Sequence, residues 1–165
     1  DSGGYVYRYD YIGATGYWQA PSKFLGDQSN ADTLKFDLWN NYNDDQNVDP
    51  LVVLETVGIS APIYLDYADY GTVGSTPTTF SVVLSSSTGW VNRQTGLAAT
   101  DSDMQSFLSN LSNLYIMNDH HIGRENYTDT AFLDNVELSI VPIPGAFLLG
   151  MIGLSVAGLK LRKHT

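Results

Sequence analysis

The segment Leu34-Lys35-Phe36-Asp37-Leu38-Trp39 gives the clearest indication of how this chain folds. Leu34, Phe36 and Leu38 alternate with polar or exposed positions, and successive side chains of a β-strand point to opposite faces of a sheet. The pattern predicts a strand that buries one face against a core and leaves the other toward solvent. We therefore expect a fold built mainly from strands.

Further short segments of this kind follow along the chain, separated by clusters of Gly, Pro, Asn, Asp and Ser. They are rich in Val, Ile, Tyr and Phe, which pack well on a half-buried pleated surface. The additional predicted strands are residues 51–57, 63–67, 80–84, 114–117 and 132–140.

One segment has a helical period instead. Its apolar residues recur at i, i+3, i+4 and i+7: Met104, Phe107, Leu108 and Leu111. Thr100 is a suitable N-cap, so we predict a helix from about Asp101 to Asn110 with its apolar face on a sheet. Many strands and one covering helix predict an all-β fold, a jelly-roll β-sandwich over residues 16–140. Residues 1–15 are expected to form an N-terminal lead-in.

Residues 1–140 are strongly acidic. They hold all 18 acidic residues and five of the eight basic residues, which gives a net charge of −13. Such a charge repels a phosphate backbone, so we expect no nucleic-acid partner. The chain has no cysteine, which excludes disulfide bonds and thiolate metal sites.

The composition changes abruptly after residue 140. The segment Val141-Pro142-Ile143-Pro144 is followed by an apolar stretch without a charged residue. A helix over residues 146–161 would be about 24 Å long, slightly short for a hydrocarbon core of ~30 Å. We predict that this C-terminal helix spans a membrane, within a tail of residues 141–165.

The end of the chain is basic, through Lys160, Arg162 and Lys163. Long basic side chains can extend to the lipid headgroups, and they remain on the cytoplasmic side of a membrane. This orientation places residues 1–140 outside the cell.

The order of Pro-x-Pro motif, short apolar helix and basic end resembles the PEP-CTERM sorting signals of Gram-negative bacteria, in their Val-Pro-Leu-Pro-Ala form. Here Ile143 stands in place of Leu, and Gly145 in place of Ala. The resemblance implies an exported protein that the tail holds transiently in the inner membrane. It also implies cleavage by an exosortase and release to the cell surface or extracellular matrix.

Several sequence blocks occur in an order typical of one family: residues 17–21, 23–27, 34–38, 89–90, 100–111 and 131–138. Together they resemble the laminin B domain, also called laminin IV. The resemblance implies a jelly-roll sandwich related in shape to carbohydrate-binding modules. It further implies an extracellular domain that is not an enzyme.

No set of residues indicates a catalytic centre. His120 and His121 are adjacent, so on extended backbone they point to opposite sides. No serine lies in a Gly-x-Ser-x-Gly elbow, and no pair of carboxylates is distinguished from the others. We predict no catalytic residue and no required cofactor, with a hydrolase of unrecognised site as a remote alternative.

Calcium is the one candidate metal. Asp27 follows an early glycine and Asp134 lies in the last predicted strand, and Ca²⁺ prefers such oxygen ligands. The alternative is that both carboxylates accept hydrogen bonds from backbone amides at strand ends.

Three aromatic residues are candidates for glycan binding: Tyr64, Tyr67 and Trp90. Sugars bind to aromatic faces that have hydrogen-bonding groups beside them. The alternative is that these rings fill the sandwich core with their polar tips at its rim.

These observations favour a non-catalytic surface or matrix protein with adhesive or structural contacts to surface proteins. The second interpretation is a carbohydrate-binding module for extracellular polysaccharide.

Overall fold

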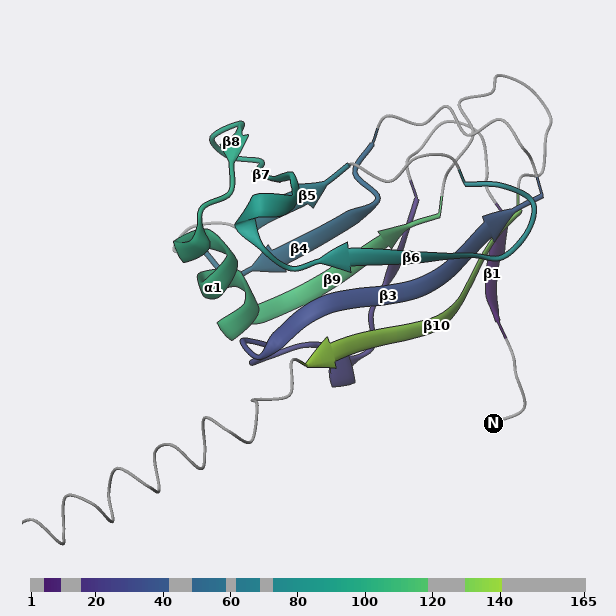
Figure 1. Cartoon of the computed structure of the whole chain (residues 1–165), viewed down its shortest axis with the longest axis horizontal. Helices are drawn as coiled ribbons and strands as arrows, with labels where there is room; N and C mark the ends of the chain where they lie inside the picture. Colours follow the sequence, from purple (N-terminus) through teal and green to yellow (C-terminus); the bar gives the residue numbers. More distant parts are fainter. Residues whose placement is uncertain are drawn as a thin grey trace, which may run out of the picture.

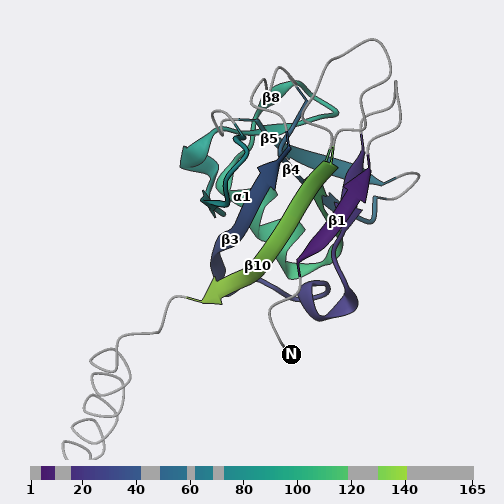
Figure 2. The ribbon, with the colours of Figure 1, turned by 90° about the vertical axis from the view of Figure 1, so that its right-hand side faces the viewer.

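A computed structural model describes residues 5–9, 16–41, 49–58, 62–68, 73–118 and 130–140, and these form two antiparallel sheets packed face to face (Figures 1 and 2). The four-stranded sheet has the order β1 (Val6–Tyr9), β10 (Thr130–Ile140), β3 (Ala31–Asn40) and β6 (Thr78–Val83). The six-stranded sheet has the order β2 (Tyr17–Gln19), β9 (Leu111–Met117), β4 (Val52–Thr56), β5 (Ile63–Tyr67), β7 (Trp90–Asn92) and β8 (Leu97–Ala98). The prediction of an all-β sandwich with one helix is confirmed.

The core lies between the two sheets and is built on β3. Leu34, Phe36 and Leu38 have no exposed surface, as their alternation predicted. Phe36 stacks on Phe80 of β6, with 5.6 Å between ring centroids. Burying an apolar side chain of this size contributes about 1.5–3 kcal/mol to stability, so this strand is a major part of the core.

Helix α1 (Asp101–Ser109) covers one end of the sandwich and begins where the sequence predicted (Figures 1 and 2). Thr100 accepts a hydrogen bond from the backbone N–H of Asp103, and the Asp103 carboxylate accepts one from the backbone N–H of Thr100. This reciprocal capping box satisfies two backbone donors at the start of the helix. Met104, Phe107 and Leu108 are buried, so the apolar face packs as expected.

Four short strands were not predicted. They are β1, β2, β7 and β8, of two to four residues each. Strand β1 lies within the predicted lead-in, yet it pairs with β10 over Val6↔Leu133 to Tyr9↔Thr130. Strands this short contain too few alternating positions for a periodic signal, and only their partner strands define them. Two short 3₁₀ helices, Ser22–Phe24 and Ser86–Thr88, complete the described elements.

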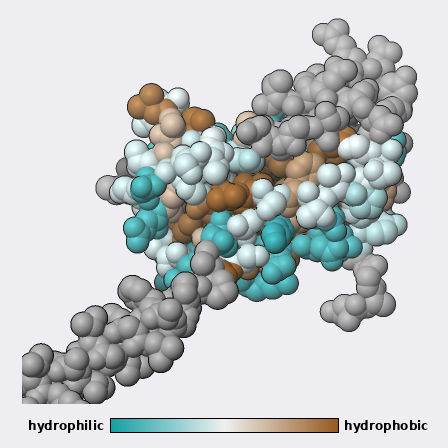
Figure 3. All heavy atoms as spheres, viewed as in Figure 1, coloured by the Kyte–Doolittle hydropathy of each residue, from teal (hydrophilic) through white to brown (hydrophobic). Residues whose placement is uncertain are grey.

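The surface has a band of hydrophobic residues across one face, with hydrophilic residues beside it (Figure 3). Hydrophobic residues also gather at the end of the molecule that carries β8, where Leu97 is 68% exposed (Figure 3). In the described part of the chain, no helix has the length and apolar character to cross a membrane. The predicted spanning helix of residues 146–161 lies outside the described residues.

Candidate functional site

Alternate side chains of the six-stranded sheet point away from the core. Leu65 of β5 is buried in the core, and its neighbours Tyr64 and Asp66 lie on the opposite face. The same alternation places Glu55 of β4 and Tyr115 of β9 on this outer face. The outer face has a hollow of about 340 Å³, which we call the tyrosine hollow, lined by Tyr17, Gln19, Val53, Tyr64, Arg93 and Tyr115.

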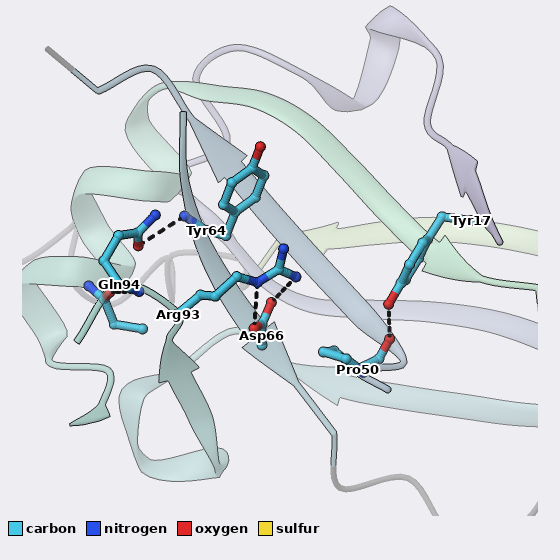
Figure 4. A network of polar contacts seen from close by, with 7 residues as sticks. Tyr17, Pro50, Tyr64, Asp66, Arg93 and Gln94 are labelled. Carbon is cyan, nitrogen blue, oxygen red and sulfur yellow. Dashed lines mark hydrogen bonds and ion pairs between the residues drawn. The ribbon is translucent and has the colours of Figure 1, made fainter. Parts of the chain in front are cut away.

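Arg93 is held at one side of the tyrosine hollow by Asp66 (Figure 4). The guanidinium donates through Nε and Nη2 to the two carboxylate oxygens, at 2.8 and 2.7 Å. Its central carbon also lies 4.6 Å from the ring centroid of Tyr64, in cation–π contact. The hydrogen bond to Asp66 raises the pKa of Arg93 above its ordinary value. This paired geometry fixes a long side chain in one position.

Glu55 organises the neighbouring side of the outer face. Its Oε2 accepts a hydrogen bond from the Tyr115 hydroxyl at 2.9 Å, and its Oε1 accepts one from Nδ2 of Asn113 at 3.0 Å. Burial raises the pKa of Tyr115 to about 12, and the hydrogen bond to the Glu55 carboxylate acts in the same direction. Asn113 also accepts a hydrogen bond from Gln19, which connects the network to the edge strand β2.

Tyr17 completes the hollow from β2. Its hydroxyl donates to the backbone carbonyl of Pro50 at 3.2 Å (Figure 4). Its ring meets that of Tyr115 edge to face, with centroids 6.3 Å apart. The walls of the hollow are therefore aromatic rings whose positions are set by hydrogen bonds and ring contacts.

Only one of the three predicted glycan residues lies in the tyrosine hollow. Tyr64 lines it, whereas Tyr67 is half-buried and packs on Trp90, with ring centroids 5.2 Å apart. Trp90 has no exposed surface, and its Nε1 donates to the carbonyl of Val83 at 2.9 Å. A ring without an exposed face cannot stack on a sugar, so we assign Trp90 to the core instead.

The two predicted calcium ligands are on separate elements. Asp27 is exposed, and hydrogen bonds from Ser29 lower its pKa. Asp134 accepts a hydrogen bond from the backbone N–H of Asn135, which has a positive φ of 51°. The described residues contain no group of three His, Cys, Asp or Glu side chains that could hold a metal ion. The calcium hypothesis therefore rests on sequence alone, and a thermal midpoint unmoved by Ca²⁺ or chelator would contradict it.

A second hollow of about 300 Å³ lies beside Asp134 and does not include Asp27. Its lining is mostly apolar and includes Trp18, Phe24, Ile116 and Leu133. The indole Nε1 of Trp18 is buried without a hydrogen-bond partner in the described structure.

Several residues singled out in the sequence lie outside the described residues. They are His120 and His121, the motif Val141, Pro142, Ile143 and Pro144, and the basic residues Lys160, Arg162 and Lys163. The sorting prediction for the tail therefore remains a prediction.

Comparison with known proteins gives one matching family model and two similar solved structures. A family model described as Laminin B (Domain IV) matches residues 17–145. The structure of the L4b domain of human laminin alpha-2 superimposes with a TM-score of 0.63 at 12% identity, covering 76% of this chain and 70% of that one. The structure titled "Solution structure, dynamics and binding studies of CtCBM11" has a TM-score of 0.47 at 13% identity, covering 86% and 92% of the two chains. No curated protein sequence matches the chain.

Proposed function

The chain belongs to the Laminin B (Domain IV) family, and from this premise we propose that it is a non-catalytic binding domain whose tyrosine hollow takes a saccharide chain. The single observation that carries the proposal is the hollow itself. Three tyrosine rings and the Arg93–Asp66 pair from four neighbouring parts of one sheet meet around it.

The physical chemistry of the hollow suits a sugar. A pyranose ring presents apolar C–H groups on its faces and hydroxyls around its edge. Tyrosine rings offer apolar contact together with a polar tip, and Arg93 offers N–H donors beside them. The side chains are already held by Glu55, Asp66 and the Pro50 carbonyl, so little conformational entropy is lost when a ligand binds.

A second candidate function is adhesion to other surface proteins. Strand β1 is at the edge of the described four-stranded sheet, and Tyr5, Val6 and Tyr7, at and just before the start of this strand, are 52–56% accessible. An edge strand can accept a strand from a partner. This function uses the opposite sheet and does not need the tyrosine hollow.

The same proposal includes export. The Pro-x-Pro motif, apolar segment and basic end of residues 141–165 support transient residence in the inner membrane and cleavage by an exosortase. The mature domain would then act at the cell surface or in the polysaccharide matrix. We also propose that the sandwich is a jelly roll.

A glycan array followed by titration calorimetry on the full chain tests the saccharide proposal. We expect binding to at least one oligosaccharide, and Tyr64→Ala should weaken it at least tenfold, since loss of one stacked ring costs about 1.4 kcal/mol or more. Tyr7→Ala is the matched control, because Tyr7 is an exposed tyrosine on the other sheet. Equal effects of the two substitutions would refute a site in the hollow.

A further inference from the structure

We infer that the tyrosine hollow selects uncharged saccharides and rejects acidic ones, an inference that rests on the proposed saccharide function. Extracellular polysaccharides fall into neutral and acidic chemical classes, which differ in the charge of the ligand. The paired charges at the hollow and its remaining hydrogen-bonding groups determine which class it binds.

The positive charge at the hollow is neutralised within the protein. Among the described residues, Arg93 is the only basic one that lines it, and both carboxylate oxygens of Asp66 accept hydrogen bonds from the guanidinium. Glu55 pairs in register with Tyr64, contacts the lining residue Tyr115 and receives its described hydrogen bonds from uncharged donors. Together Glu55, Asp66 and Arg93 have a net charge of −1.

The surrounding domain adds to this effect. Residues 1–140 have a net charge of −13, and the described salt bridge is the one between Arg93 and Asp66. A uronate or sulfate group entering the hollow would meet a carboxylate field and no unpaired cation. Charges of this kind act over about 10 Å at 0.1 M salt.

The remaining hydrogen-bonding capacity favours hydroxyl groups. Arg93 has N–H groups beyond the two that contact Asp66, and these can only donate. The hydroxyl oxygen of Tyr115, which lines the hollow and donates to Glu55, can accept a hydrogen bond. A sugar hydroxyl both donates and accepts, so it matches this mixed set. An acidic group could only use the donors, and an ammonium group could only use the acceptors.

The test is a set of polysaccharide pairs that share a backbone and differ in charge, titrated with the full chain. Suitable pairs are hydroxyethyl and carboxymethyl cellulose, and dextran and dextran sulfate. We expect binding to a neutral member and at least about tenfold weaker binding to its acidic partner at low salt, with the gap narrowing at 0.5 M salt.

The outcomes separate the two claims. Preference for an acidic member over its neutral partner would overturn the charge inference and leave saccharide binding intact. Absence of binding to every neutral and acidic glycan would overturn the proposed function and this inference with it.

A substitution at the ion pair gives a second, independent readout. Asp66→Asn leaves Arg93 as an unpaired cation, so binding of the acidic partner should strengthen by about tenfold. Binding of the neutral glycan should weaken, because Asp66 no longer holds Arg93 in position. Asp37→Asn is the matched control, because it changes the net charge equally on the four-stranded sheet, where Asp37 accepts hydrogen bonds from Thr79 and Asn135. An equal gain in both variants would mean that overall charge alone sets the preference, and would overturn the inference. Circular dichroism of both variants checks that the sandwich remains folded.

Discussion

Single residues on the outer face of the six-stranded sheet have their chemistry set by their neighbours. Glu55 illustrates this, because its carboxylate accepts hydrogen bonds from Asn113 and Tyr115. The Ser112 hydroxyl donates to the Glu55 backbone carbonyl at 2.9 Å and lies 3.4 Å from the carboxylate oxygen Oε1. These donors are uncharged, so they hold an anion without cancelling its charge. The result is an acidic position that can receive a hydroxyl but not another anion.

The raised pKa of Tyr115 leads to a pH-dependent prediction. A tyrosine whose pKa rises from 10.0 when unfolded to about 12 when folded contributes stability that is fully present below pH 10 and is lost as the pH rises toward 12. We therefore expect Tyr115→Phe to make the thermal midpoint fall less steeply between pH 10 and 12. Midpoints measured by circular dichroism across this window check it.

The control for this experiment is Tyr7→Phe, which removes an exposed tyrosine from the edge strand β1. If Tyr115→Phe and Tyr7→Phe were indistinguishable above pH 10, Tyr115 would not be the group responsible.

The sequence predicts the bounds of the long strands better than those of the short ones. Strand β5 has the predicted bounds, Ile63–Tyr67, and β3 extends the predicted segment by a few residues to Ala31–Asn40. Both contain enough alternating positions for the period of two to be seen. Strands β2 and β7 have three residues each, which is too few positions to show this period. They form because β9 and β5 supply their hydrogen-bond partners.

The cap of α1 gives a prediction at the scale of an element. Thr100→Ala removes the side chain that accepts from the Asp103 N–H, so the free energy of unfolding should fall by about 1 kcal/mol. Urea unfolding followed by circular dichroism measures the change. Ser102→Ala, at an exposed position inside the helix, should change stability by less than about 0.5 kcal/mol. A similar loss in both variants would show that the cap is not the cause.

In the whole molecule, the candidate saccharide site and the candidate protein-binding edge lie on different sheets. The tyrosine hollow is on the outer face of the six-stranded sheet, and the exposed edge strand β1 belongs to the four-stranded sheet. A saccharide and a protein partner could therefore be bound without competing for the same residues.

Cleavage of the C-terminal tail gives a prediction for the whole chain. Expressed in a host with an exosortase, the surface-associated protein should lack Lys160, Arg162 and Lys163, because cleavage near Val141-Pro142-Ile143-Pro144 removes everything after it. Intact-mass spectrometry of protein released from the cell surface measures this. A mature form that still contains residues 160–165 would instead identify the tail as a permanent anchor.

The sequence by itself determined the class of fold, the main core strand, the helix with its cap, and Tyr64 as a candidate contact. These follow from periodicity and local hydrogen bonding, which depend on residues close together in the chain. The alternation of Tyr115 with the buried Leu114 and Ile116 was a further signal that could have placed its ring on the outer face.

Only the tertiary structure decided which aromatic residues face solvent together. Tyr17, Tyr115 and Arg93 meet Tyr64 because β2, β9, β4, β5 and β7 lie next to one another in this order in the sheet, and Arg93 directly follows β7. Strands β2 and β9 are far from β5 in sequence. The same non-local pairing placed Trp90 in the core against Tyr67. Sheet order is set by the packing of the whole core, so local patterns could not reveal either the tyrosine hollow or the neutralising partner of Arg93.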